Sequence, residues 1–453
     1  MRFFLHGVKV PHRKNTEKMA AVRMPAPASV TIPMQQHIGK PALPIVKPGD
    51  EVFVGTLIAE QDGFISSPVY SSVSGKVKSL TDLLMPNGVK CRAIVIESDG
   101  NMTPDPSVAP PTVTNKAELV EAIRRSGTVG LGGAGFPSYV KFNIPEGKTV
   151  DELIINGAEC EPYITSDTRT MVDKSDDMLH GIVTILDLLN IPRAVIGIEG
   201  NKKEAIASMK AMAEKDPRIS VKVLPTLYPQ GAEKVIIYHT VGKVTPAGKL
   251  PLDVGCIVTN CTTVACIGNY LKVGMPLVSK CVTVDGGALN GRGNVIVPIG
   301  TSLKEVFEFI GGFSEFPHKV LLGGPMMGHA VASLDIPVMK NTNATLAVTE
   351  DEIREKKHTA CIRCGACVSH CPLSLNPQAY LKAYNAGKTE VLEKLRVDIC
   401  MECGCCSFIC PTAQPLVETN KLAKGLLRSL AAEKKKKEEE KKMKEESKNV
   451  RAE

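Results

Sequence analysis

Short runs in which apolar and polar residues alternate dominate residues 27–100. Turn residues such as Lys47-Pro48-Gly49-Asp50 separate the runs, and alternation with a period of two is typical of half-buried strands. We therefore predict a small all-β module in this region. Its expected strands are Val30–Ile32, Glu51–Glu60, Phe64–Tyr70, Gly75–Leu80 and Ala93–Glu97.

The spacing of apolar residues changes after residues 101–111, a Pro-rich polar stretch that indicates a linker. In Lys116–Arg125, for example, Leu119, Val120 and Ile123 recur at helical spacing. Helices and strands then alternate, which predicts an α/β domain with a largely parallel sheet over residues 112–272. The expected strands are Val150–Ile155, Ala194–Ile198 and Ser220–Leu224, and the expected helices are Thr170–Leu189 and Lys202–Glu214, the second capped by Asn201.

A third, smaller domain is expected at residues 273–315. Its strands lie near Cys281–Asp285 and Asn294–Pro298. Ser302 and Glu305 have the spacing of a capping box, which predicts the start of a helix that ends at Gly311-Gly312.

Charged residues mark both ends of the chain. Residues 1–26 form a basic segment, which is either a solvated tail or a surface for an anionic lipid or an acidic partner. The block Lys434–Lys448 is a solvated helix or a disordered tail, and we assign no chemistry to residues 431–453. The basic residues of the first segment are Arg2, Lys9, His12, Arg13, Lys14, Lys18 and Arg23.

Composition narrows the functional classes. The chain has no Trp and only eight Tyr, so it offers little for stacking on nucleic acid. No run of about 18 apolar residues predicts a membrane-spanning helix. The chain opens without the apolar core of a secretion signal, so we expect its 15 cysteines to be reduced thiols in the cytoplasm, available for metal or redox chemistry.

Eight cysteines between residues 351 and 425 repeat one spacing. The two motifs are Cys361-x2-Cys364-x2-Cys367-x3-Cys371-Pro372 and Cys400-x2-Cys403-x2-Cys406-x3-Cys410-Pro411. Three thiolates on a tight turn cap three corners of a [4Fe–4S] cubane, and the fourth cysteine of such a motif ligates the other cluster. One cluster is therefore expected to use Cys361, Cys364, Cys367 and Cys410, and the other Cys400, Cys403, Cys406 and Cys371.

Zinc knuckles are the alternative for these motifs. They would pair two Cys-x2-Cys turns and would need neither the third cysteine nor Cys-Pro, so the duplicated spacing favours iron–sulfur clusters. Cys405 fits neither ligand set, and His370 is a candidate for tuning a cluster. The other cysteines are expected to be packing residues: Cys91, Cys160, Cys256, Cys261, Cys266 and Cys281.

A glycine-rich stretch, Gly130–Pro137, matches the G-x-G-x-x-G pattern at Gly130, Gly132, Gly133 and Gly135. A Rossmann dinucleotide site needs a strand before this pattern and a helix after it, whereas here a helix precedes and Phe-Pro follows. We therefore exclude that site. Glycines still let backbone amides approach a phosphate or a flat ring, and Lys141 is placed to pair with a phosphate.

A second candidate motif, Asn156–Pro162, ends the first predicted strand of the α/β domain. It places Asn156, Glu159 and Glu161 at the carboxyl edge of the sheet, where ligands of α/β domains bind. A structural turn with surface acids is the alternative.

Together these motifs resemble the NADH-oxidising flavoprotein subunit of respiratory complex I. Gly130–Pro137 with Lys141 is similar to its flavin loop, Asn156–Pro162 to its acidic motif, and Asn260-Cys261-Thr262-Thr263 to a later flavin contact. The resemblance implies noncovalent FMN with an NAD(H) site stacked on it. It implies flavin or nicotinamide contacts at Asn156, Glu159, Glu233, Asn260 and Thr263. We expect Glu159 and Glu161 to be the catalytic carboxylates. This chain departs from that flavoprotein in carrying two clusters, and Ala158 where the flavoprotein has an acid.

From Phe4-Leu5-His6-Gly7 to Pro411, the order of modules resembles the C subunits of Rnf complexes, which are ion-translocating ferredoxin:NAD oxidoreductases. The implied fold is multidomain α/β. Its modules are a barrel-sandwich, lipoyl-like module (27–100), an FMN/NADH domain (112–272), a β-grasp, SLBB-like domain (273–315) and a helical, ferredoxin-like two-cluster domain (351–425). The resemblance implies a peripheral electron-transfer subunit on the cytoplasmic face of the membrane. Its expected partners are membrane and iron–sulfur subunits, with ferredoxin reached through one of them.

Two other functions stay open. Cobalamin reductases resemble the flavin, β-grasp and cluster parts, although that family generally lacks an N-terminal β module. A non-catalytic relay or scaffold protein would carry clusters without hydride chemistry. The coupling ion and the direction of electron flow are not indicated by the sequence.

Overall fold

The computed structural model describes residues 6–353 and 356–449, and the chain divides into two compact units. The larger unit is Lys9–Arg354, and the smaller is Glu355–Glu453 together with Met1–Val8. Arg2 of the basic segment, and Phe4 and Leu5 of the expected N-terminal motif, lie outside the described residues.

The predicted all-β module is present in the larger unit as two facing antiparallel sheets. A four-stranded sheet has the order β2-β8-β7-β4, and a three-stranded sheet has the order β3-β5-β6. The predicted strand Glu51–Glu60 is two strands, because Gly55 adopts a φ of +97° between them. The strands are β2 (Ser29–Pro33), β3 (Leu43–Pro44), β4 (Glu51–Val52), β5 (Leu57–Glu60), β6 (Val69–Tyr70), β7 (Gly75–Leu84) and β8 (Lys90–Ser98).

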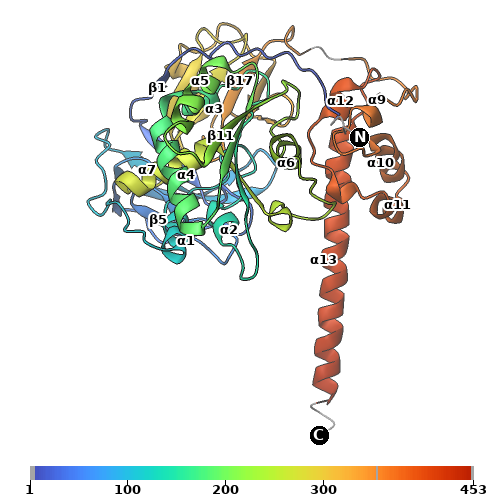
Figure 1. The fold of residues 1–453 in the computed structure, drawn as a ribbon, viewed down its shortest axis with the longest axis horizontal. Helices are drawn as coiled ribbons and strands as arrows, with labels where there is room; N and C mark the ends of the chain where they lie inside the picture. Colours follow the sequence, from blue (N-terminus) through green and yellow to red (C-terminus); the bar gives the residue numbers. More distant parts are fainter. Residues whose placement is uncertain (1–5, 354–355, 450–453) are drawn as a thin grey trace. The chain divides into compact units, whose positions relative to one another are not determined.

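The α/β domain contains a four-stranded parallel sheet between helices (Figure 1). Alternate residues of its central strand β9 point to opposite layers: Leu153 and Ile155 face the larger helical layer, and Ile154 packs against α6. The strand order is β11 (Ile219–Leu224), β10 (Ala194–Glu199), β9 (Glu152–Gly157) and β12 (Cys256–Asn260). The helices are α1 (Lys116–Arg125), α2 (Ser138–Phe142), α3 (Ser166–Asp173), α4 (Ser175–Leu189), α5 (Lys203–Ala213), α6 (Glu233–Val241), the 3-10 helix η1 (Pro251–Val254) and α7 (Cys261–Val273).

Two predictions about these helices were wrong. The expected helix Thr170–Leu189 is two helices, α3 and α4, which meet at Lys174. Asn201 does not cap α5: the cap position is Lys202, and no described residue hydrogen-bonds to the Asn201 side-chain oxygen.

The third domain is a six-stranded sheet that extends well beyond the predicted range 273–315. Its order is β1 (Ala21–Arg23), β14 (Gly293–Pro298), β13 (Ser279–Asp285), β17 (Ala344–Val348), β15 (Lys319–Leu322) and β16 (His329–Ala330). The predicted capping box is confirmed, since Ser302 and Glu305 bond reciprocally at the start of α8 (Leu303–Phe309). Strand β1 comes from the basic N-terminal segment, and Thr16 before it is fully buried. The solvated-tail interpretation is therefore wrong for this part of the segment.

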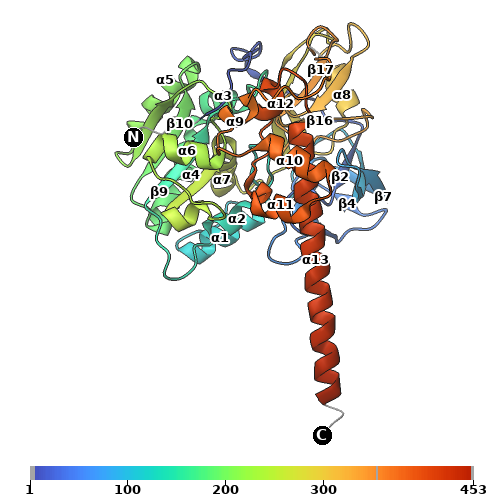
Figure 2. The same cartoon turned by 90° about the vertical axis from the view of Figure 1, so that its right-hand side faces the viewer.

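The smaller unit is helical and includes both cysteine motifs. Helices α10 (Pro377–Asn385) to α12 (Cys405–Ile409) pack along the first part of the long helix α13 (Leu416–Asn449), which runs on beyond them (Figure 2). The unit also contains α9 (Ala366–Ser369), α11 (Thr389–Lys394) and the 3-10 helix η2 (Val397–Ile399). The block Lys434–Lys448 is thus helical, and residues 431–440 are exposed. No helix within the described ranges is long and apolar enough to cross a membrane.

Two glycines allow α4 and α7 to cross closely on the sheet. A Cβ added at Gly268 would lie 1.9 Å from the carbonyl oxygen of Asp177, and one at Gly181 would lie 2.5 Å from that of Val264. We predict that Gly268→Ala forces the helices apart and destabilises the domain by about 1–3 kcal/mol. Thermal unfolding and faster hydrogen exchange in α4 and α7 would measure this effect. Gly200→Ala is the control, since a Cβ there meets its nearest neighbour at an ordinary 3.5 Å. Equal stability of the two variants would contradict the prediction.

Candidate flavin and iron–sulfur sites

The glycine loop, residues 130–137, joins α1 to α2. A helix precedes the loop where a Rossmann site needs a strand, whereas Phe136-Pro137 does not prevent a helix from following. The loop is closed at its base, where the Gly130 amide donates to the Phe136 carbonyl at 2.8 Å. Gly132 and Gly133 are exposed at its tip, and a Cβ at Gly133 would meet nothing within 4 Å. The tip therefore presents bare backbone to solvent.

The carboxyl ends of β9 and β12 bring the two predicted asparagines side by side. Asn156 and Asn260 are partners in the parallel ladder. The Asn260 side-chain oxygen caps α7 by accepting the amides of Thr262 and Thr263 at 3.0 and 3.2 Å, while its nitrogen donates to Asp167 at 2.7 Å. The Asn156 side chain donates to the Gly231 carbonyl at 2.8 Å.

The glycine loop lies against these strand ends. The Leu131 amide donates to the Thr263 hydroxyl at 3.0 Å, and a Cβ on Gly132 would come within 3.1 Å of the Asn260 side chain. Lys141, from α2, donates to the Val258 carbonyl at 3.0 Å and lies 3.4 Å from the Glu233 carboxylate. The structure thus gathers at one sheet edge the loop glycines, Lys141, Asn156, Glu233, Asn260 and Thr263.

The two predicted catalytic carboxylates lie on the acidic loop, residues 158–165, which joins β9 to α3. Glu159 is buried, and its carboxylate accepts the Asp167 amide and the Thr168 hydroxyl, both at 2.7 Å. The buried ammonium of Lys202 lies 3.3 Å from the same carboxylate. Glu159 therefore has strong partners within the chain.

Glu161 has a different environment. One carboxylate oxygen accepts the Met326 amide at 3.0 Å, and the other is buried with no hydrogen-bond partner among the described residues. Burial raises the pKa of Glu161 to about 7. A carboxyl group with such a pKa can be protonated or ionised near neutral pH.

Sequence reasoning missed the charged residues that surround the acidic loop. Lys14 donates to three carbonyls in this region, and burial, followed by the charge of Lys202, lowers the pKa of its ammonium to about 8. Burial raises the pKa of Glu199 to about 7. Lys14 was noted only as part of the basic segment. Glu199 ends β10, so the strand-end rule that selected Asn156 could also have selected it.

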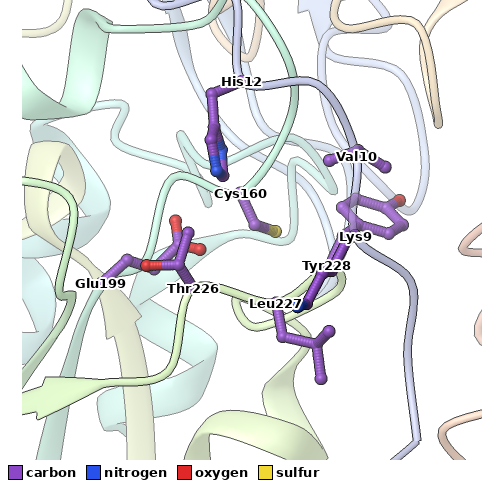
Figure 3. A pocket seen from close by; sticks show the side chains of 8 residues that line it. All are labelled: Lys9, Val10, His12, Cys160, Glu199, Thr226, Leu227 and Tyr228. Carbon is purple, nitrogen blue, oxygen red and sulfur yellow. The ribbon is translucent and has the colours of Figure 1, made fainter.

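A cavity of about 260 Å³ opens beside Cys160 of the acidic loop (Figure 3). It is lined by Lys9, Val10, His12, Cys160, Glu199, Thr226, Leu227 and Tyr228. Burial raises the pKa of the Cys160 thiol to about 12, which keeps it protonated at neutral pH and agrees with its expected role in packing.

The second triplet of cluster cysteines lies with the last cysteine of the first motif. Cys371, Cys400, Cys403 and Cys406 line one apolar recess together with Leu373, Leu375 and Val417, and Cys405 also lines it. Cys367 packs against an apolar cluster that contains Cys410, and Cys406 belongs to the same cluster. The recess groups Cys371 with the second triplet, as crossed ligation requires, and both ligand sets stay a prediction.

Short N–H···S contacts surround the cysteines of these motifs. The Glu402 amide and the Asn420 side chain each lie 3.4 Å from the Cys400 sulfur, and the Gln414 amide lies 3.4 Å from the Cys410 sulfur.

Within the described residues, no three His, Cys, Asp or Glu side chains converge on a point that would hold a single metal ion. Cubane thiolates bind different iron atoms, so they need not converge in that way. His370 hydrogen-bonds the Ala366 carbonyl at 2.9 Å.

Family models match four successive parts of the chain. They are described as the RnfC barrel sandwich hybrid domain over residues 2–101, the Nuo51 FMN-binding domain over residues 123–269, the SLBB domain over residues 281–330 and the 4Fe-4S dicluster domain over residues 357–413. These matches agree with the predicted order of modules. The FMN-binding match contains the glycine loop and both strand ends, and the dicluster match contains all eight motif cysteines.

Curated relatives cover most of the chain. The C subunit of the proton-translocating ferredoxin:NAD(+) oxidoreductase complex of Clostridium ljungdahlii is 45% identical over 78% of this chain and 78% of its own length. The C subunit of the Na(+)-translocating complex of Acetobacterium woodii is 40% identical over 83% of this chain and 85% of its own. The C subunit of the ion-translocating oxidoreductase complex of Rhodobacter capsulatus is 37% identical over 92% of this chain and 81% of its own length.

The FMN-binding and dicluster domains imply electron transfer, and the resemblance to Rnf C subunits is confirmed over most of the chain. The chain belongs to the family of C subunits of ion-translocating ferredoxin:NAD+ oxidoreductase complexes, the Rnf complexes.

Proposed function

We propose that this protein exchanges hydride with NAD(H) at an FMN held on the glycine loop, and that it passes the electrons singly through two [4Fe–4S] clusters. One observation carries the proposal: the glycine loop, Lys141 and the in-register pair Asn156 and Asn260 meet at one sheet edge. Ligands of parallel α/β sheets bind at that edge.

The residues at this edge fit a flavin phosphate and ring. Exposed glycines at the loop tip leave room for a ring or phosphate to approach the backbone. Lys141 supplies a positive charge, and Asn156 and Asn260 supply amides. FMN, when bound, would supply hydride exchange and the change from two-electron to one-electron transfer, and the clusters would supply one-electron relay.

The carboxylates would act on the nicotinamide side. Glu161 is the carboxylate whose hydrogen bonds within the chain are incomplete, and we assign it to the nicotinamide side. Glu159 would orient the start of α3, since it already accepts the Asp167 amide. Glu233, half-exposed beside Lys141, would contact NAD(H) at the rim of the site.

Membership of an Rnf complex implies other Rnf subunits as partners. We infer that these are membrane and iron–sulfur subunits, that ferredoxin is reached through one of them, and that this chain lies peripherally on the cytoplasmic face of the membrane. Ion translocation would then belong to the membrane subunits.

Cofactor analysis of the full chain, purified and reconstituted without oxygen, tests the proposal. We expect one FMN that is released on denaturation, and about eight iron and eight sulfide per chain. Iron–sulfur clusters without flavin would support the relay alternative and overturn the hydride role. Zinc without sulfide would overturn the clusters.

The glycine loop gives a direct prediction. Gly132→Val should abolish FMN binding and leave the iron content unchanged, because the new side chain occupies the space between the loop and Asn260. Fluorescence of released flavin measures this loss. Gly293→Val is the matched control, since a Cβ at Gly293 meets nothing within 4 Å. Full flavin occupancy in Gly132→Val would make the loop purely structural.

Crossed ligation gives a second prediction. Cys371→Ser should remove or alter the cluster held by Cys400, Cys403 and Cys406, a loss of about four of eight irons, and spare the other cluster. Cys405→Ala is the matched control, because Cys405 lines the same recess but belongs to neither ligand set. Iron analysis and electron paramagnetic resonance distinguish the two variants. Damage confined to the cluster of Cys361, Cys364 and Cys367 would refute the crossed arrangement.

A further inference from the structure

The acidic loop is held by a lysine from outside the α/β domain. Lys14, in the segment before β1, donates to the carbonyls of Glu159, Glu161 and Ile164 at 2.7, 2.7 and 2.6 Å. The same segment is fixed in place on both sides: the His12 carbonyl accepts the Tyr163 amide at 3.0 Å, and the Thr16 and Thr165 hydroxyls are 2.6 Å apart.

The glycine loop is held in a similar way at its base. Lys340, between β16 and β17, is 1% exposed, and it donates to the Ser67 hydroxyl and the carbonyls of Pro68 and Gly127 at 3.1, 2.6 and 2.8 Å. Ser67 and Pro68 belong to the β module, and Gly127 leads into the glycine loop. This one ammonium therefore connects all three domains of the larger unit.

Both contacts match the chemistry of an ammonium group. A lysine ammonium has three N–H donors and no acceptor, so it can satisfy three convergent oxygens at once. The carbonyls of an irregular loop are not paired by a sheet or helix, and a buried carbonyl without a partner is costly. Each lysine therefore fixes three acceptors in one arrangement.

The β module and the segment around Lys340 also contact the glycine loop beyond its base. The Ile38 amide donates to the Gly135 carbonyl at 3.0 Å, and the Asn341 side chain donates to the Gly133 carbonyl at 2.8 Å. A Cβ at Gly135 would lie 3.4 Å from the Gln36 carbonyl. The glycine loop is thus held by the β module and by the segment that contains Lys340, while Gly132 and Gly133 stay exposed.

We propose that Lys14 and Lys340 are positioning residues for two different steps: Lys14 holds the acidic loop for NAD(H), and Lys340, with the β module, holds the glycine loop for FMN. This inference rests on the proposed function. It also assigns a role to the N-terminal β module, which helps to hold the glycine loop in place.

Hydrogen exchange of the FMN-free full chain tests the positioning without any appeal to catalysis. Lys14→Met should speed exchange in residues 158–165, and Lys340→Met should speed exchange in residues 127–137, each about tenfold, the scale of one lost hydrogen bond. Lys18→Met and Lys304→Met are the controls, because both lysines are exposed; Lys18 lies in the same segment as Lys14, and Lys304 lies in the same domain as Lys340. If each variant behaves like its control, the proposal is wrong.

Kinetics of the loaded protein separates the two steps. Lys14→Met should raise the KM for NADH about tenfold while FMN is retained, and Lys340→Met should speed FMN dissociation about tenfold. If a methionine variant fails to fold, a milder substitution replaces it in the same measurement. Lys14→Arg should give an intermediate KM, because a planar guanidinium does not match three convergent carbonyls, and Asn341→Ala should loosen FMN.

Hydrogen exchange and kinetics together distinguish failure of the lysine proposal from failure of the proposed function. Equal loss of FMN and of NADH affinity in both lysine variants would overturn separate positioning. If the wild-type chain neither binds FMN nor oxidises NADH, the proposed function fails, and the exchange experiment still decides whether the lysines hold the loops.

Discussion

The parallel register of β9 with β12 is the constraint on which the flavin site depends. It places Asn156 and Asn260 side by side at the ends of adjacent strands. A slip of one residue would turn either side chain to the opposite face of the sheet. Asn260 also caps α7 and bonds Asp167, so the same register orients a helix on the sheet and links β12 to α3. The glycine loop then packs on Asn260 and Thr263.

The loops around these strand ends depend on neighbouring domains. A buried group of charges lies beneath the acidic loop, where Lys202 lies within 3.5 Å of both Glu17 and Glu159. Buried charges are tolerated when they are paired and hydrogen-bonded, and here the partners come from different modules. The segment before β1 therefore contributes to the stability of the α/β domain. Along the chain, the whole β module separates the two.

Periodicity predicted three of the four strands of the parallel sheet, and α1 to the residue, because these elements have clear apolar faces. It missed β12 and α7, whose Cys- and Thr-containing sequences show no such pattern. The same reasoning missed β1, a three-residue strand that exists through its pairing with β14. The glycine loop, Lys141 and Asn156 were selected from a glycine pattern and the end of a predicted strand, and Asn260 from the family resemblance. The structure brings them to one sheet edge, and their contacts to FMN stay a prediction. Lys14 and Lys340 were not selected, because a lysine that bonds distant backbone carbonyls leaves no trace in local spacing.

The central claim is that hydride is exchanged with NAD(H) at the α/β domain and that single electrons pass between that site and the clusters. An anaerobic titration of the reconstituted full chain with NADH, followed by absorbance and electron paramagnetic resonance, tests it most directly. The account predicts that NADH bleaches the flavin and that signals of reduced [4Fe–4S] clusters then appear. A chain with full FMN and iron whose clusters are reduced by dithionite, but whose flavin stays oxidised with excess NADH, would contradict it.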